Sequence, residues 1–411
     1  MHTIPSDLTN YPLAPSAEYT PTPHTTHDAM RYYTSTSGLN LLRPRMVLTQ
    51  VSVFGTDNSA LLDDLAKLNG HKPTAGREVA DASADNSGDR SEVAARGVVV
   101  IDPDRISVSE LEMLWSRGAR GVRINLVSVS RSVTREELRG VLQGTIDKLA
   151  LTRIQRDGSS RDSKDSDGKD SSTSSTKTSD NNIDDTHNTK DSNDNNTNHG
   201  QKKWVIELYI PFTLVETLHS IIPSLANTHQ ICFCLDHFAG LKFPSPSPTP
   251  DNNNNNNTTT TTSSNQDLVD PAPPTLDTPA FSVLLSLLTT SHPQTYLKVS
   301  APYRVDATYL SAPTATLRRL EPFALTLVRR ASDRLVWASD WPHTRFEEVD
   351  TIPFVEALVE WCDVVAGDEG GDADAEKGDA VRTRSERLRE KVFRTNAERL
   401  WDMSSSASTV I

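Results

Sequence analysis

The sequence is poor in the features that mark secreted, membrane and nucleic-acid-binding proteins. Its three cysteines among 411 residues are too few for a disulfide framework, so we expect a reducing compartment and a cytoplasmic protein. It has no apolar run of about 18 residues and no basic stretch followed by an apolar run at its start, which argues against a membrane partner or a secretory leader. Its net charge of -13 argues against a nucleic-acid partner. A small anionic ligand bound by a local arginine cluster stays compatible, and the oligomeric state is left open.

Four polar segments contain almost no large apolar residues. They cover residues 72–96, 155–201, 243–270 and 367–379, the last of which is acidic. Because such segments bury too little surface to order the backbone, we expect 155–201 and 243–270 to be disordered insertions. What remains is on the order of 300 residues, the size of one (β/α)8 barrel. One domain over residues 1–411 with insertions is therefore predicted.

Short apolar, β-branched segments alternate with amphipathic ones, which is typical of βα units on a parallel, buried sheet. The expected strands are Met46–Val53, Gly97–Ile101, Gly121–Val127, Trp204–Ile210, Ile231–Asp236, Tyr296–Ser300 and Leu335–Ser339. The expected helices are Ala29–Leu42, Ser59–Leu68, Val108–Arg117, Arg135–Leu151, Thr213–Ile222, Ala280–Leu288, Ala315–Arg330 and Pro353–Val365, and a last helix, Val381–Leu400, would cap the barrel. The alternation predicts an α/β fold, a single (β/α)8 TIM-type barrel.

The barrel expected from this pattern lacks room for its first strand. Of the residues ahead of the first helix, only Met1–Ile4 is available for a strand, so we expect a truncated strand, two unpaired edges and a core open to water. On this interpretation the natural protein begins further upstream. The insertion 155–201 joins a helix to a strand and is expected on the stability face. The insertion 243–270 follows a strand and is expected over the face where barrel active sites lie.

Polar residues follow several predicted strands at the face where a barrel binds its substrate. Asp340 follows the last strand, and His237 follows the fifth. A carboxylate in that position can act as a base, although Asp340 taken alone could equally be the N-cap of the next turn. Arg123 and Asn125 are two residues apart on one strand, so both can point toward the same mouth.

Taken together, the motifs resemble the amidohydrolase-2 group of hydrolases. The segments that carry the resemblance follow the family's order: Tyr11–Pro15, Gln50–Asn58, Arg120–Asn125, Asp236–His237, Lys298–Arg304, Ser339–His343 and the closing Asn396–Trp401. The pairing of Gly-Thr-Asp-Asn at 55–58 with Lys-x-Ser-x-Pro-Tyr-Arg at 298–304 is similar to the 2-pyrone-4,6-dicarboxylate lactonase branch. The resemblance spans nearly the whole chain outside the insertions and implies a (β/α)8 barrel.

The resemblance implies catalytic roles for a few of these residues. Asp340 would be the general base that activates water, and His237 would polarise a lactone carbonyl or orient the water. Arg123 and Arg304 would bind carboxylates of the substrate, since guanidinium groups bind them bidentately. From the residues alone, Arg123 could instead be a buried partner of a neighbouring acid.

Further substrate contacts are expected with less specific support from the motifs. These candidates are Ser52, Tyr19, Asn125, Lys298, Tyr303, His343 and Arg131, the last at a longer spacing after Arg123 than the family shows. Ser52 could instead be a packing residue, and Gly55–Asn58 simply the turn before a helix. Lys298 could be a cation at the mouth or a snorkelling strand residue. His343 could merely cap its turn.

The metal site of metal-dependent members is incomplete in this sequence. Those members begin with His-x-His on the first strand, because two imidazoles on one face bind one ion. Only His2 is available here, and it aligns with the second of the two histidines. We therefore expect no cofactor, in agreement with the lactonase branch. A single zinc ion held by His2, His237 and Asp340 is the alternative.

The sequence thus predicts a hydrolase that acts on a carboxylated lactone or a similar cyclic ester through water activated by Asp340, with His2 and His237 beside it. The first alternative is a metal-dependent decarboxylase of an aromatic or pyrone acid. The second is a catalytically silent barrel that binds a ligand or a partner, which the incomplete first strand motivates.

Overall fold

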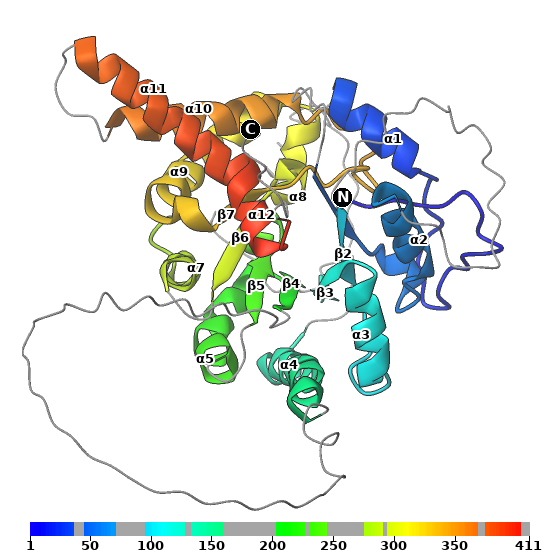
Figure 1. The fold of residues 1–411 in the computed structure, drawn as a ribbon. Helices are drawn as coiled ribbons and strands as arrows, with labels where there is room; N and C mark the ends of the chain where they lie inside the picture. Colours follow the sequence, from blue (N-terminus) through cyan, green and yellow to red (C-terminus); the bar gives the residue numbers. More distant parts are fainter. Residues whose placement is uncertain are drawn as a thin grey trace, which may run out of the picture.

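The computed structural model describes residues 1–36, 45–70, 95–127, 133–158, 203–226, 231–244, 275–290, 294–368 and 375–403. Its centre is a parallel sheet of seven strands in chain order, and helices lie around the outside of this curled sheet (Figure 1). None of the helices in these ranges is long and apolar enough to cross a membrane. Most of the predicted insertions, and Arg131 with them, lie outside the described residues.

All seven expected strands are present. They are β1 Met46–Thr49, β2 Ala95–Val99, β3 Ala119–Asn125, β4 Val205–Tyr209, β5 Cys232–Leu235, β6 Thr295–Val299 and β7 Leu335–Trp337. Each strand pairs in parallel with the next. Nearly all their residues are buried because helices cover one face and barrel-interior side chains fill the other. The first strand ends earlier than predicted, since the chain turns into a 3-10 helix at Ser52–Phe54.

The helices between the strands follow the predicted alternation. The longer ones are α2 Ser59–Leu68, α3 Val108–Ser116, α4 Arg135–Gly158, α5 Val215–Ala226, α7 Pro279–Thr289, α9 Pro313–Ala331 and α10 Ile352–Asp368. Local sequence fixes where they begin: Ser107 and Glu110 form a capping box at α3, and Thr278 caps α7 ahead of Pro279. Short helices follow two strands directly, α6 His237–Gly240 after β5 and α8 Pro302–Val305 after β6. Both turns present residues to the mouth.

Several other predicted boundaries were wrong, and three of them change an element. The first helix, α1 Thr26–Arg31, begins earlier and continues as a π-helical turn at Tyr32–Thr36. The acidic loop at 367–379 is helical at both ends, because α10 runs to Asp368 and α11 Ala375–Glu390 begins among good helix formers. The last helix is not continuous: a π-helical turn, Lys391–Thr395, separates α11 from α12 Asn396–Leu400.

No strand forms at Met1–Ile4, yet this segment spans the gap between β1 and β7 at the mouth. The amide of Thr49 donates to the carbonyl of Met1 at 2.8 Å, and the amide of His2 donates to the carbonyl of Trp341 at 2.7 Å. Ile4 forms a single antiparallel bridge with His24. The mouth end of both sheet edges is therefore hydrogen-bonded, and His2 is held there.

The opposite end of the barrel is filled by the chain after α12. Trp401 is buried with Val98, Val205, Cys232, Cys234, Tyr296 and Val336 from the strands. It lies so close to Gly121 that a Cβ there would come within 2.7 Å of its ring. Asn396 donates to the carbonyl of Leu335 at the start of β7, and Arg45 before β1 pairs with Glu398. The expectation of a core open to water was therefore wrong, because residues from both ends of the described chain cover the gap.

Candidate active site

A cavity of about 590 Å³ lies at the carboxyl ends of the strands. Eight of the predicted site residues line it: His2, Tyr19, Ser52, Arg123, Asn125, His237, Arg304 and Asp340. Three other candidates, Lys298, Tyr303 and His343, are not part of the lining. Arg123 and Asn125 both reach the cavity, as their spacing on one strand predicted.

Asp340 lies just after β7 in a left-handed turn (φ 58°), and this conformation turns its side chain into the cavity wall. Its Oδ2 accepts hydrogen bonds from the Tyr303 hydroxyl and from Nε of Arg304, both at 2.6 Å. Burial opposes ionisation of the carboxyl, but the Arg304 guanidinium, the nearby histidines and the Tyr303 hydroxyl together hold its pKa well below the usual range. The other oxygen, Oδ1, faces His237.

His237 begins the tight turn α6, in which three successive residues adopt left-handed backbone angles. Its Nδ1 is 2.9 Å from the Ser300 hydroxyl, and its Nε2 is 3.7 Å from Oδ1 of Asp340. The ring of Tyr209 meets the imidazole edge-on at 4.9 Å. Burial, chiefly, and the surrounding guanidinium groups lower the pKa of His237 to about 3. The imidazole is therefore neutral at pH 7.

The turn around His237 depends on a glycine. Gly240 has φ 74°, and a Cβ at this position would come within 2.0 Å of the carbonyl oxygen of Ile210. Any side chain would have to move backbone, which is costly. The glycine therefore lets the chain reverse directly after β5 and hold the imidazole over the barrel.

His2 occupies the gap between β1 and β7. Its Nδ1 is 2.6 Å from the carbonyl oxygen of Thr49. Because a carbonyl only accepts, Nδ1 carries the proton and Nε2 keeps its lone pair. Burial and the charge of Arg123 lower the pKa of His2 to about 3. The cavity therefore contains a neutral imidazole that can accept a hydrogen bond from water.

Arg123 belongs to a buried network of four charged side chains beneath the cavity. Its guanidinium lies 3.6 Å from Oε1 of Glu207 and 3.5 Å from Oδ2 of Asp236. Lys298 contacts both carboxylates, Glu207 closely and Asp236 at 3.0 Å. Arg123 thus lines the cavity and is also the partner of buried acids. Lys298 is neither a mouth cation nor a snorkelling residue, because it points into the barrel interior, where only buried carboxylates can neutralise it.

The two acids of this network differ in their ease of ionisation. Burial and the charge of Glu207 raise the pKa of Asp236 to about 7. Burial also opposes ionisation of Glu207, but Lys298 and Arg123 outweigh it and lower the pKa of Glu207 to about 2. The pair therefore holds at least one negative charge across the physiological range, and this charge keeps Arg123 in place.

Tyr303 and His343 lie behind Asp340. The Tyr303 hydroxyl is also 3.1 Å from Nδ1 of His343. Its single proton is donated to the Asp340 carboxylate, so Nδ1 of His343 is the donor to the phenol oxygen. Nε2 of His343 is buried without a hydrogen-bond partner, and burial lowers the pKa of this imidazole to about 4. These two residues position Asp340 from outside the cavity.

The rim of the cavity contains residues that sequence reasoning missed. Arg345 has φ 71°, and its guanidinium lies 4.5 Å from the ring centre of Tyr19 and 3.4 Å from a carboxylate oxygen of Glu18. Tyr209 lines the wall beside His237. Tyr209 could have been noticed as a polar residue near the end of the predicted strand Trp204–Ile210. Nothing in the sequence marked Arg345 or Glu18, since a turn with an unusual backbone angle brings them together.

The histidines and Asp340 do not form a metal site in this arrangement. In the part of the chain that the structure describes, no group of three or more His, Cys, Asp or Glu side chains could hold a metal ion. Oδ2 of Asp340 is occupied by Tyr303 and Arg304. A guanidinium in contact with the carboxylate disfavours a second cation there. A single zinc ion, the alternative considered from the sequence, would have only Oδ1 of Asp340 and Nε2 of His2 and His237 available to it.

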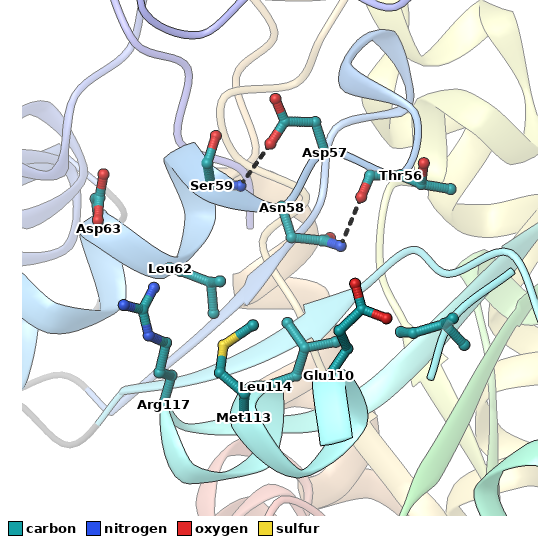
Figure 2. A pocket seen from close by; sticks show the side chains of 11 residues that line it. Thr56, Asp57, Asn58, Ser59, Leu62, Asp63, Glu110, Met113, Leu114 and Arg117 are labelled. Atoms are coloured by element: carbon teal, nitrogen blue, oxygen red, sulfur yellow. Dashed lines mark hydrogen bonds between the residues drawn. The ribbon is translucent and has the colours of Figure 1, made fainter. Parts of the chain in front are cut away.

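A second cavity of about 480 Å³ lies outside the barrel between α2 and α3. Figure 2 shows Asp57 accepting a hydrogen bond from the amide of Ser59, and the side-chain amide of Asn58 donating to Thr56. Asn58 also bonds the backbone of Val100 after β2. Residues 55–58 thus form the turn before α2, which was the alternative interpretation of this motif. Of these four residues, only Gly55 lines the first cavity.

Comparisons with known proteins agree with this fold. Residues 270–403 match the sequence model of the amidohydrolase family, Amidohydro_2. A 96-residue stretch is 29% identical to the 2-pyrone-4,6-dicarboxylate hydrolase of Comamonas testosteroni, covering 21% of this chain and 31% of that protein. The matched stretch thus spans under a third of the relative's length.

Two solved structures are similar along nearly their whole length. A putative 2-pyrone-4,6-dicarboxylic acid hydrolase from Pseudomonas putida has 19% identity and a TM-score of 0.54, with 99% of this chain and 97% of the other covered. A probable 2-pyrone-4,6-dicarboxylic acid hydrolase from Acinetobacter baumannii, with citric acid bound, has 16% identity and a TM-score of 0.52, covering 98% and 97%. At identities this low, the structural similarity shows a shared fold and nothing more.

The family resemblance expected from the motifs is therefore confirmed. Residues 270–403 resemble the amidohydrolase family, and the described fold is TIM-barrel-like. The proteins named above, to which the chain is similar, are 2-pyrone-4,6-dicarboxylate hydrolases.

Proposed function

We propose that this protein hydrolyses a lactone or similar cyclic ester that carries carboxylates, through water activated by Asp340. The observation that carries the proposal is the arrangement of one ionised carboxylate and two neutral imidazoles around a cavity lined with arginines. The names of the similar proteins support the substrate class, and one of them binds citric acid, which is itself a carboxylate.

The reaction needs a water molecule between Asp340 and the lactone carbonyl. The water oxygen attacks the carbonyl carbon while its proton passes to Oδ1 of Asp340, the oxygen that Tyr303 and Arg304 leave available. Nε2 of His2 has a lone pair facing the same cavity and can accept the second hydrogen of that water. The tetrahedral intermediate then collapses, the ring C–O bond breaks, and the ring oxygen takes up the proton. The product is the open-chain acid.

The arginines supply binding and charge stabilisation. Arg123 lies on β3 and Arg304 in α8 after β6, and both face one cavity, so they can bind separate carboxylates of one substrate. His237 lines the same cavity and can donate from Nε2 to the carbonyl oxygen if Ser300 donates to its Nδ1. Developing negative charge on that oxygen would then be stabilised by a group already in place.

We also infer that the sheet is an eight-position (β/α)8 barrel in which the segment Met1–Ile4 takes the place of the remaining strand at the mouth. The support is its backbone hydrogen bonding to both Thr49 and Trp341, and the near-complete coverage of two similar structures. On this inference His2 lies at a strand end, like the other proposed catalytic residues.

The direct test is turnover of 2-pyrone-4,6-dicarboxylate by the purified full chain, followed by loss of the pyrone absorbance, with and without prior dialysis against a chelator. We expect hydrolysis in both samples. Release of carbon dioxide would favour the decarboxylase, and binding without any turnover would favour a silent barrel. Activity that disappears on dialysis and returns with zinc would contradict the mechanism through Asp340 alone.

A further inference from the structure

We propose that Arg345 is a specificity residue at the rim of the cavity. Its guanidinium exchanges its contact with Glu18 for a contact with an anionic group of the substrate, distant from the reacting carbonyl. This inference rests on the proposed function and adds a residue to it. It follows from how the three arginines around the cavity are paired.

The rim is formed by the chain after Asp340 and by the loop that carries Glu18 and Tyr19. Arg345 is held with its guanidinium over the Tyr19 ring, at 4.5 Å from the ring centre. The Tyr19 side chain in turn is hydrogen-bonded to Ser52. All four residues line the cavity. A ligand in the cavity can therefore meet this guanidinium at the rim.

The other two arginines are bound to buried acids. Arg304 is hydrogen-bonded to Asp340, whose side chain is 5% exposed. Arg123 lies between Glu207 and Asp236, which are 1% and 2% exposed. Taking a partner away from a buried carboxylate leaves an uncompensated charge in the interior, which is strongly destabilising. A substrate carboxylate can approach these arginines, but it cannot replace their partners without that cost.

The pair at the rim differs in this respect. Arg345 and Glu18 are 57% and 52% exposed, and their closest atoms are 3.4 Å apart. Exposed pairs at such a distance contribute little stability, because water solvates both groups. If Arg345 moves to a ligand, Glu18 stays solvated. Exchange of partners is therefore least costly at this position.

The charges around the cavity favour such an exchange. The cavity and the network beneath it contain four cations, Arg123, Arg304, Arg345 and Lys298, and four acids, Glu18, Asp340, Glu207 and Asp236, and the pKa of Asp236 is raised to about 7. A substrate carboxylate at the rim adds one negative charge. Moving Glu18 into solvent offsets that charge without moving a buried group. The cavity should therefore distinguish a dicarboxylate from a monocarboxylate of the same shape.

The test compares two aromatic acids that cannot be hydrolysed, isophthalate and benzoate, by calorimetric titration of the full chain. We expect the wild type to bind isophthalate at least about tenfold more tightly than benzoate. The second carboxylate of isophthalate can form an additional charge-assisted hydrogen bond with Arg345, which benzoate cannot form. Arg345→Gln should remove most of that ratio and leave the affinity for benzoate within about twofold. Glu18→Gln should tighten isophthalate binding, because the competing carboxylate is gone. Arg329→Gln, an exposed change on α9, is the matched control.

Equal weakening of both ligands by Arg345→Gln would overturn the proposal, and so would an unchanged ratio or a wild type that does not distinguish the two acids. The test is independent of turnover. The predicted affinity ratios without hydrolysis of the pyrone would support the role of Arg345 and contradict the proposed lactonase function. Hydrolysis of the pyrone without these ratios would support the lactonase function and contradict the role of Arg345.

Discussion

Nε of Arg304 donates a hydrogen bond to Oδ2 of Asp340 at 2.6 Å, so the proposed base and a proposed substrate-binding guanidinium bind each other. This contact explains why the pKa of Asp340 lies well below its usual range in spite of burial. It also links binding to catalysis. A substrate carboxylate that draws the Arg304 guanidinium toward itself weakens the contact and makes Asp340 a stronger base.

Replacing Arg304 should therefore change the pH profile as well as binding. Arg304→Gln removes the charge that stabilises ionised Asp340, so the pKa of the base rises. Activity needs the ionised form and is lost as pH falls through that pKa, so the acid limb of kcat/KM should move to higher pH. KM should rise by about tenfold or more, because a charge-assisted contact is lost. Arg304→Lys should move the limb less, and an acid limb at the wild-type position in Arg304→Gln would contradict the link.

Asp340→Asn should abolish hydrolysis while leaving the fold in place. An amide cannot take the water proton at neutral pH, and loss of general-base assistance costs about 10²-fold or more in kcat. The amide can still accept from Tyr303 and Arg304, so the chain should still fold, with a lower melting temperature because the ion pair with Arg304 is lost. Asp277→Asn, an exposed change before α7, is the matched control. Turnover like that of the wild type in Asp340→Asn would remove Asp340 from the mechanism.

The two buried histidines should make the fold sensitive to acid. The pKa values of His2 and His237 are about 3 in the folded state against 6.5 for an ordinary histidine. Between these values the unfolded chain binds more protons, so this contribution to stability is full above pH 6.5 and is lost as pH falls toward 3. The slope is up to about 1.4 kcal/mol per pH unit for each histidine.

Urea unfolding between pH 5 and 8 would measure this effect. His237→Gln cannot titrate, so its free energy of unfolding should fall less between pH 7 and pH 5 than that of the wild type. His219→Gln, an exposed change on α5, should show the wild-type slope. Parallel curves for wild type and His237→Gln would show that the imidazole is not held neutral by burial.

The sequence predicted the elements of the sheet and the residues at strand ends better than it predicted the contacts between distant segments. Asp340 and His237 could be predicted as site residues because parallel strands end at one face, so the polar residues that follow them lie close together. The alternation of residues on β3 correctly placed Arg123 and Asn125 together. Strand periodicity therefore carried most of what could be predicted about the site.

What could not be predicted depends on tertiary contacts without a local signal. Glu207 and Lys298 are on different predicted strands, and nothing in the sequence indicated that they neutralise each other inside the barrel. Trp401 lies far from the strands in the chain, and its place beneath Gly121 depends on the shape of the barrel floor. Arg345 reaches Tyr19 through a left-handed backbone angle that its sequence does not favour. Each arises from packing rather than from periodicity.

The buried network beneath the cavity gives the last prediction. Lys298→Met leaves two carboxylates on the single guanidinium of Arg123, and breaking a buried pair in this way costs about 3–5 kcal/mol. Glu207→Gln alone leaves two cations facing Asp236 and should also destabilise. The double variant Lys298→Met/Glu207→Gln keeps one cation and one acid, so it should be clearly more stable than the sum of the single changes implies. Urea unfolding of the four proteins measures this coupling. Free energies that simply add would show that the four charges do not act as one network.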